Sequence, residues 1–501
     1  MKRICKTTLC LVLCLVLLLA FALSGCAQKN AAEEPEIEIT STTAPVQPGE
    51  IIAEGSCGEQ LSWKLDENGL LIIEGSGDMD SSYLIVAGGE GVDDCSPLWN
   101  GHGKEITAIV LPDGLKSIER FAFANCTALA SVILPERLET IHYGAFHGCT
   151  ALTCMVIPDS VTSVEGGEFS GCSALTSVKL GKGLDSISSY MFSDCSSLEH
   201  VIFPEGLKRI GISAFSGCNS LTSVTIPDSV TDVFPYAFVN CAALSKLEIG
   251  KAVTTIYPFA FSALPSLSTI RVADGNPAYS VRDGVLFDKE QKTLLLYPAA
   301  KQDSSYQIPD SVTAINAGAF MNCTALTDVE IPESVLGIGD GAFCNCTSLS
   351  AIRVDADNPS FAAQDGVLFN KTGTRLIQYP GGKRDASYTI PDGVESFGAA
   401  AFAGCIALTS VTIPDGVTEI AASTFTGCSA LNSVMIPDSV KSINDGAFSS
   451  CKALTELRLP SGIFSISNSA FEGCDSLVLY VTGGSYAENY ARENNLPFER
   501  K

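Results

Sequence analysis

A phenylalanine returns every 23 residues along most of this 501-residue chain. Seven follow one another without a slip, and six more resume the same step after two longer intervals: Phe123, Phe146, Phe169, Phe192, Phe215, Phe238, Phe261, Phe320, Phe343, Phe402, Phe425, Phe448 and Phe471. A fixed period of about 20–30 residues indicates a solenoid, in which each repeat buries its apolar face only against its neighbours. The sequence therefore predicts a stack of thirteen coils.

The repeat from Phe215 to Phe238 shows how one coil is built. Its middle contains the pattern L-x-x-V-x-I, which predicts a short β-strand with two inward side chains, at Leu221, Val224 and Ile226. Pro227 lacks an amide hydrogen and ends this strand. The apolar residues that follow are three to four positions apart, which favours an irregular or short helical return segment.

The unit A-F-x-x-C-x-x-L-x-x-V-x-I-P-x-x-V-x-x-I resembles the BspA-like class of leucine-rich repeats of bacterial surface proteins, over roughly residues 104–482. The resemblance implies a leucine-rich-repeat solenoid with a curved parallel β-sheet on its concave face. It also implies adhesion or protein binding at a cell surface. A scaffold by itself does not identify the ligand.

A cysteine follows the phenylalanine by three residues in twelve units, and Leu264 takes its place in the other. Side chains stacked in register point the same way, whereas a disulfide needs side chains that converge. A single column also cannot surround a metal ion tetrahedrally. We therefore expect no metal or cofactor, and a structural column of buried thiols: Cys126, Cys149, Cys172, Cys195, Cys218, Cys241, Cys323, Cys346, Cys405, Cys428, Cys451 and Cys474.

The first residues have the pattern of an export signal. Lysines and an arginine precede an apolar run that ends at Leu23-Ser24-Gly25-Cys26, which is typical of a lipoprotein signal peptide over residues 1–25 with lipidation of Cys26. An ordinary signal peptide and an uncleaved anchor helix remain alternatives. Residues 26–50 predict an acidic disordered tether. All three alternatives place the rest of the chain outside the cytoplasm, and the lipid form anchors it to the cell membrane, facing outside.

Both ends of the solenoid need caps, because an open end exposes apolar core and strand edge. Residues 51–103 predict a β-rich N-terminal cap, in which Cys57 and Cys95 either pair or remain thiols. Residues 483–501 predict a short helical C-terminal cap. Two insertions, at 273–308 and 355–390, repeat one another and each predict a hairpin. Such insertions bind ligands in some repeat proteins and only extend the coil in others.

Charge and motifs argue against two classes of function. The chain has 31 Lys and Arg against 56 Asp and Glu, and this net charge of −25 disfavours binding of nucleic acid. Its four histidines form no zincin motif, and there is no G-x-S-x-G or P-loop. The carboxylates recur in the turn after each strand, so no pair is set apart for catalysis. We expect no enzyme activity.

The outward-facing strand positions are the candidate binding surface: Ile133, Val156, His200, Ile202, Lys246, Glu248, Arg271, Asp328, Glu330 and Arg353. The first part is apolar and the middle carries mixed charge. No aromatic residue occupies these positions, so they do not predict stacking on sugars or nucleobases. The pattern suits a cell-surface, lipid-anchored protein-binding module whose ligand is a host, cell or matrix protein. The alternatives are a structural spacer or envelope component without a defined ligand and, third, an enzyme with a site in the insertions or a cap.

Overall fold

The computed structural model describes residues 48–79, 97–99 and 101–501, and Pro48–Lys501 form one compact unit. The predicted signal peptide, the lipidation site Cys26 and most of the predicted tether lie outside the described residues. So does Cys95, the proposed partner of Cys57.

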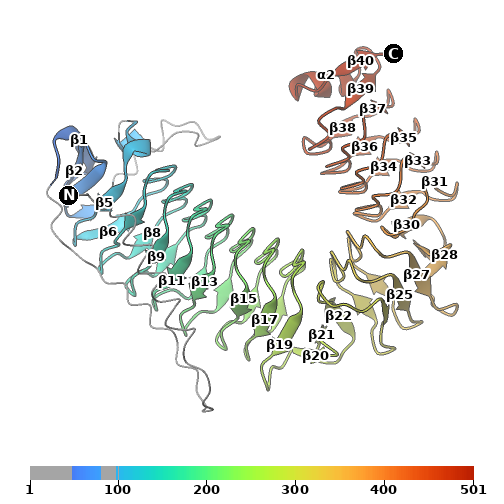
Figure 1. Ribbon diagram of the computed structural model, residues 1–501, viewed down its shortest axis with the longest axis horizontal. Helices are drawn as coiled ribbons and strands as arrows, with labels where there is room; N and C mark the ends of the chain where they lie inside the picture. The colour runs from blue at the N-terminus through green and yellow to red at the C-terminus, as the bar shows by residue number, and fades with distance from the viewer. Residues whose placement is uncertain (1–47, 80–96, 100) are drawn as a thin grey trace, which may run out of the picture. The chain divides into compact units, whose positions relative to one another are not determined.

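The described residues form a leucine-rich-repeat solenoid, as the sequence predicts (Figure 1). In each coil, the L-x-x-V-x-I segment or its equivalent forms a first strand, and these strands pair in parallel within sheets that span two or three coils, so that Ser223 lies opposite Lys246. These first strands are β5 (Ala108–Val110), β7 (Ser131–Val132), β9 (Cys154–Val156), β11 (Ser177–Lys179), β13 (His200–Ile202), β15 (Ser223–Thr225), β17 (Lys246–Ile249), β19 (Thr269–Val272), β23 (Ser305–Gln307), β25 (Asp328–Ile331), β27 (Ala351–Val354), β31 (Ser387–Thr389), β33 (Ser410–Thr412), β35 (Ser433–Met435), β37 (Glu456–Arg458) and β39 (Val478–Val481).

The return segments consist of tight turns and a second short strand, and residues 106–482, all of them described, contain no helix. The second of the two apolar residues that the sequence places three positions apart, such as Val233 after Val230, lies in this strand. Neighbouring second strands pair in parallel within each sheet, with Ile210, Val233 and Ile256 in register. The second strands are β6 (Leu115–Ile118), β8 (Thr140–Ile141), β10 (Ser163–Val164), β12 (Ser186–Ile187), β14 (Arg209–Ile210), β16 (Asp232–Val233), β18 (Thr255–Ile256), β22 (Thr293–Leu296), β24 (Ala314–Ile315), β26 (Gly337–Ile338), β30 (Arg375–Gln378), β32 (Ser396–Phe397), β34 (Glu419–Ile420), β36 (Ser442–Ile443) and β38 (Ser465–Ile466). Coils stacked at strand spacing favour this extended return path over a helix.

The repeated phenylalanines form a buried stack of rings. Phe215 lies with its centroid 5.4 Å from Phe192 and 5.1 Å from Phe238, and neither neighbour is tilted by more than 18°. Burial of a phenylalanine side chain contributes about 1.5–3 kcal/mol, so this column is a main source of stability. Tyr297 and Tyr379 occupy the same position in two further coils, each 5.3 Å from the next ring. The solenoid therefore has more coils than the thirteen phenylalanines, with sixteen first strands.

Each insertion contributes one of these tyrosine coils and a hairpin. In the first, β20 (Tyr279–Arg282) and β21 (Val285–Asp288) are antiparallel, and β21 pairs with β22, which joins the second strands of the coils. Asp283 and Gly284 turn the chain with φ values of 51° and 81°. The second insertion repeats this arrangement with β28 (Phe361–Gln364), β29 (Val367–Asn370) and β30.

A buried asparagine fixes the start of each hairpin. The Asn276 side-chain amide donates to the carbonyls of Gly250 and Val253, at 2.8 and 3.1 Å, and its oxygen accepts from two backbone amides. Asn358 makes the equivalent bonds in the second insertion. The hydrophobic core is divided into three clusters at the two insertions.

The ends of the solenoid are covered differently. At the N-terminal end, β1 (Ile51–Gly58), β2 (Leu61–Asp66) and β3 (Leu70–Gly75) form an antiparallel sheet whose last strand pairs in parallel with β5. A further strand, β4 (Gly77–Asp78), pairs with β6. Two 3-10 turns follow, η2 (Pro97–Trp99) and η3 (Gly103–Glu105), and the Trp99 ring stacks 5.3 Å from Phe123, so it begins the aromatic column.

At the C-terminal end, β40 (Phe498–Arg500) pairs with β39, and helix α2 (Tyr486–Glu493) lies over the last coil. The Ser485 side chain caps this helix by accepting from the Glu488 amide. No helix in the described part of the chain has the length and apolar character needed to cross a membrane.

Candidate functional site

The first strands expose one row of alternate side chains, and these are the positions that the sequence predicts as a binding surface. Within β15, Val224 is buried while Ser223 and Thr225 are exposed, which is the alternation expected of a half-buried strand. Register brings the outward residues of neighbouring coils together, with His200 opposite Ser177 and Glu248 opposite Arg271. The outward strand face is therefore a continuous surface within each sheet.

The apolar part of this face is interrupted. Ile133 is 65% exposed, and Val156 and Ile202 are partly exposed. However, Lys179 pairs with both Val156 and Ile202, so it lies between them and separates them. Val110, which is 48% exposed one coil before Ile133, extends the apolar column at its other end. The binding surface predicted from the sequence begins at Ile133 and does not include Val110.

The charged part of this face pairs its own charges. Arg271, whose side chain is 73% exposed, lies 3.5 Å from the carboxylate of Glu248 in the preceding coil. Arg353 forms the corresponding ion pair with Asp328. Glu330 lies opposite Arg353 in register, and Lys246 is exposed opposite Ser223 and Thr269. Three cations and three carboxylates lie in this band, so its charge is locally balanced on a chain whose net charge is −25.

The cysteine column is buried and bonded to the backbone. The Cys218 thiol donates to the carbonyl oxygen of Phe192, one coil back, at 3.3 Å, and Cys428 bonds Phe402 in the same way at 3.1 Å. Burial raises the pKa of the Cys195 and Cys218 thiols well above the ordinary value. A protonated thiol is a poor nucleophile and a poor metal ligand. These geometries suit a structural role. Cys57 is also buried, which raises the pKa of its thiol to about 11.

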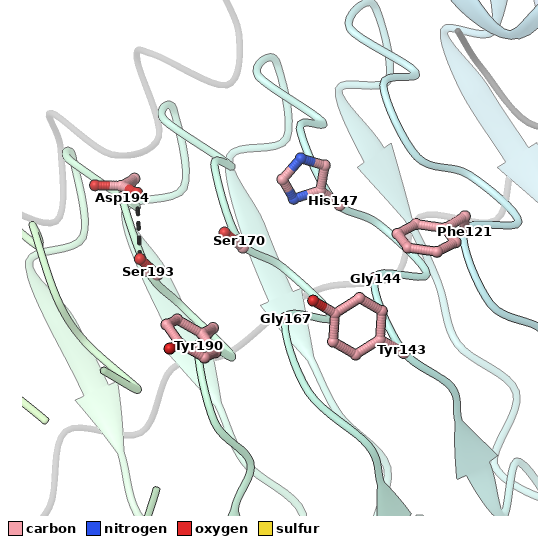
Figure 2. A pocket seen from close by; sticks show the side chains of 9 residues that line it. All are labelled: Phe121, Tyr143, Gly144, His147, Gly167, Ser170, Tyr190, Ser193 and Asp194. Carbon is pink, nitrogen blue, oxygen red and sulfur yellow. Dashed lines mark hydrogen bonds between the residues drawn. The ribbon is translucent and has the colours of Figure 1, made fainter. Parts of the chain in front are cut away.

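A groove that the sequence reading did not anticipate lies at the turns that precede the core phenylalanines (Figure 2). Its volume is about 540 Å³, and it spans four successive coils. Its walls are the rings of Phe121, Tyr143 and Tyr190, with polar groups between them. The polar lining comes from His147, Ser170, Ser193 and Asp194, and the floor from Gly144 and Gly167.

The backbone around this groove has an unusual and repeated conformation. In twelve coils the residue two positions before the core phenylalanine is left-handed: Phe121, Gly144, Gly167, Tyr190, Ser213, Tyr236, Phe259, Gly318, Gly341, Ala400, Ser423 and Gly446. Glycine adopts this conformation readily, whereas a bulky residue is strained by roughly 1–2 kcal/mol. The strained aromatic residues occur only before the first insertion. A sequence search at this offset from each phenylalanine would have found them.

Metal binding and acid–base catalysis have little support in the described ranges. They contain no group of three or more histidine, cysteine or acidic residues arranged to hold a metal ion. His142 bonds Glu165 at 2.9 Å, and Arg120 lies on the other oxygen of that carboxylate. Burial opposes the charged form of Glu165, but the hydrogen bonds from His142 and the Tyr143 amide outweigh it and lower the pKa of this carboxyl. His200 is exposed on its strand, with Glu199 3.9 Å away. These are surface ion pairs and form no acid–base constellation.

Comparison with known proteins identifies the family to which this repeat architecture belongs. Residues 102–216, 185–280, 300–369 and 384–490 match the BspA type leucine rich repeat region. Similar solved structures include a leucine rich cell surface protein from Faecalibacterium prausnitzii A2-165, at 25% identity over 88% of this chain and 97% of that chain, with a TM-score of 0.43. No curated protein matches the chain.

Two other solved structures are similar at lower identity. A leucine-rich repeat protein from Bacteroides ovatus ATCC 8483 is 21% identical over 89% of this chain and 99% of that chain, with a TM-score of 0.40. The pneumococcal vaccine antigen PcpA is 19% identical over 91% of this chain and 100% of that chain, with a TM-score of 0.41. The family model covers most of the repeats, and the chain therefore belongs to the family of BspA-type leucine-rich-repeat proteins.

Proposed function

We propose that this protein is a cell-surface module that binds another protein through its outward strand face and is held to the membrane by lipid at Cys26. The observation that carries the proposal is that the exposed strand positions differ from coil to coil while the buried ones repeat. Among these exposed positions, Arg271 and Arg353 lie beside the carboxylates of Glu248 and Asp328. A protein partner of mixed charge would match this band.

The apolar and charged parts of the face have separate roles in this proposal. Val110 and Ile133 supply exposed apolar area, which gives affinity when a partner removes it from water. Arg271 and Arg353 supply planar guanidinium groups, which bind carboxylates with defined geometry. The existing pair of Arg271 with Glu248 is exposed and contributes only about 0–1 kcal/mol, so a partner can replace it at little cost. In the pair of Arg353 with Asp328, the arginine is exposed and the carboxylate is largely covered.

The test uses cells that display the full chain and a set of purified extracellular-matrix proteins as probes. The variant combines Lys246→Glu, Arg271→Glu and Arg353→Glu. A matched control reverses three exposed lysines in the turns: Lys182→Glu, Lys251→Glu and Lys452→Glu. Both variants change the net charge equally. We expect at least a tenfold loss of affinity in the first variant and none in the control.

Two outcomes would contradict this proposal. Equal binding by wild type and by the strand-face variant would remove the charged band from the interface. Failure to bind any matrix protein would favour a structural spacer instead. The anchor is tested separately by mass spectrometry of the mature N-terminus, which should begin at a lipidated Cys26; an unmodified cysteine would refute the lipid anchor.

A further inference from the structure

The groove at the turns is lined by exposed aromatic rings and by side chains that form hydrogen bonds. Tyr143 and Tyr190 are 43% and 48% exposed, although large apolar rings are ordinarily buried or paired. The Phe121 ring meets Tyr143 edge-on at 5.4 Å, so it supports that ring from one side. Figure 2 shows His147, Ser170 and Asp194 along the upper side of the groove, above the two tyrosines. The groove therefore offers aromatic rings on one side and hydrogen-bonding groups on the other.

The floor between the two tyrosines is kept open by glycine. A Cβ atom at Gly166 would lie 3.3 Å from the Tyr143 ring, and one at Gly167 would lie 3.8 Å from it. Tyr143 therefore lies over glycine backbone that carries no side chain. Tyr190 belongs to a coil two further along, roughly 10 Å away at the usual strand spacing. The space between the rings is large enough for a flat ring to enter.

A buried carboxylate fixes this floor. Glu168, which is fully buried, accepts a hydrogen bond from the Gly166 amide at 2.6 Å and another from the Ser188 hydroxyl at 2.6 Å. Most coils have a small residue at this position, such as Ala145 or Ala214. Glu168 thus holds the glycine turn beneath Tyr143 in one conformation. It is a positioning residue that does not face the groove.

The backbone of the groove stores strain in its aromatic residues. Phe121 and Tyr190 have φ values of 54° and 60°, a conformation that costs a bulky residue roughly 1–2 kcal/mol, and equivalent coils use Gly318, Gly341 and Gly446 instead. The coil does not require an aromatic side chain at this position, because glycine occupies it in other coils. Tyr190 combines this backbone conformation with a side chain that is 48% exposed, which points to contact with a ligand.

The charge of the lining restricts what that ligand can be. Asp194 is the one carboxylate of the lining, and neither lysine nor arginine is among the residues that form it. On a chain of net charge −25, such a groove repels phosphate, sulfate and uronic acids. Exposed polar groups between the rings also disfavour an aliphatic chain, because it would leave them without hydrogen bonds.

We infer that this groove binds a neutral polysaccharide. A pyranose ring presents a face of C–H bonds, which packs against the electron-rich face of an aromatic ring, and an edge of hydroxyl groups. Tyr143 and Tyr190 would each stack against one sugar, and Asp194, Ser170 and His147 would bond to hydroxyls. Because the groove is open and crosses four coils, it accommodates a linear polymer better than a single sugar.

The test measures retention of the full-chain protein in gels that contain a defined polysaccharide. The probes are the neutral polymers β-glucan, xylan and mannan, with polygalacturonate as an anionic comparison. The variant is Tyr143→Ala combined with Tyr190→Ala, and the matched control is Tyr486→Ala, a tyrosine that is 41% exposed on the cap helix. We expect the control to be retained by at least one neutral polymer as strongly as wild type, and the double variant to lose at least tenfold in affinity.

A second variant keeps both tyrosines and fills the floor. Gly167→Asn introduces a side chain between the rings, and asparagine tolerates left-handed backbone. This change should weaken retention at least fivefold, with thermal unfolding unchanged. Tyr143→Phe should keep most of the affinity, because it preserves the ring.

Three results would overturn the inference. They are no retention of wild type by any neutral polymer, retention that is unaffected by loss of both tyrosines, or stronger retention by polygalacturonate. The strand-face variant with charge reversal at Lys246, Arg271 and Arg353 should bind polysaccharide normally, because those residues lie outside the groove. Failure of the protein-binding proposal and failure of this one are therefore distinguishable.

Discussion

The coils before the first insertion and the coils after the second have cores of the same construction. They differ at the turn that precedes the core phenylalanine. Phe215 and Phe425 are both fully buried between two stacked rings, and each is followed by a buried cysteine. At the left-handed position before the core ring, four of the seven coils of the first group carry an aromatic residue (Phe121, Tyr190, Tyr236 and Phe259) and the others carry Gly144, Gly167 and Ser213, whereas the second group carries Ala400, Ser423 and Gly446. The fold requires the backbone conformation there but not an aromatic side chain.

This difference separates residues that build the solenoid from residues that decorate it. The core positions must be equivalent, because each ring is the packing surface of the next coil. The turn position faces no such requirement, so its side chain is available for a ligand. After Ser213, which interrupts the aromatic positions, Tyr236 stacks on Phe259 at 5.5 Å and Phe234 on Tyr257 at 5.0 Å, so two further aromatic pairs lie between the groove and the first insertion.

The largest expected effect tests whether the two groups have the same core. Phe215→Ala and Phe425→Ala should each lower the local free energy of unfolding by about 3–5 kcal/mol, since each leaves a cavity in a close-packed stack. Hydrogen exchange of the flanking coils measures this loss for each group separately. A difference greater than about 1 kcal/mol between the two variants would show that the cores are not equivalent.

Substitutions in the cysteine column test the equivalence of the two cores with a smaller expected loss of stability. Cys218→Ala and Cys428→Ala each remove a buried sulfur and its bond to the carbonyl of the preceding coil, at a cost of about 1–2 kcal/mol. Denaturant unfolding of the two variants should give equal shifts. Native protein should also resist alkylation at Cys218 at pH 8, because burial keeps the pKa of this thiol high; rapid native labelling would contradict that expectation.

Glu168 is a feature of the first group alone, and its effect depends on pH. Burial raises the pKa of this carboxyl above its ordinary value of 4.5. The folded protein therefore binds this proton more tightly than the unfolded chain, and the free energy of unfolding falls as pH rises through the folded pKa. Glu168→Gln removes this contribution while it can still accept from the Gly166 amide and donate to the Ser188 hydroxyl.

Thermal unfolding of wild type and Glu168→Gln at several pH values measures this effect. The variant should gain stability relative to wild type between pH 4 and pH 8. As a control, Thr424→Ser alters the equivalent buried position of the second group, where no carboxyl titrates, and its difference from wild type should not vary with pH. A Glu168→Gln difference that is constant across this range would show that the carboxyl keeps an ordinary pKa.

The smallest effect concerns the turn itself. Tyr190→Gly relieves left-handed strain but loses ring contacts and adds chain entropy to the unfolded state, so stability should change by less than about 1 kcal/mol. The reciprocal change, Gly446→Tyr, should destabilise by about 1 kcal/mol, since the added Cβ meets no atom closer than 3.5 Å and only the backbone conformation opposes it. Calorimetric melting of both variants measures these differences. A large loss in Tyr190→Gly would make this tyrosine a structural residue.

Much of the core could be predicted because its pattern is local and repeated. The 23-residue step, the L-x-x-V-x-I strand and the cysteine position each identify buried residues directly. The two tyrosine coils were missed because Tyr297 and Tyr379 replace the phenylalanine, although each lies one period before Phe320 or Phe402. The second strand was missed because two residues are too few to show a period of two.

The candidate sites were harder to predict. The expected apolar patch contains Lys179 between Val156 and Ile202, as the 23-residue step already implies and the pairing register shows. The expectation that sugar stacking is unsupported followed from strand positions alone. Tyr143 and Tyr190 lie in turns, three and two residues before the core ring, so the strand pattern gave no signal of them.

The sequence by itself determined that this protein is a solenoid, and which side chains are buried in it, because every coil must present the same surface to its neighbours. Only the tertiary structure decided which exposed residues meet. Residues from 121 to 194 line one groove because parallel stacking brings equivalent turns of successive coils side by side. The left-handed backbone at these turns, which a pattern of hydropathy does not show, decides which of the aromatic residues in the sequence are strained.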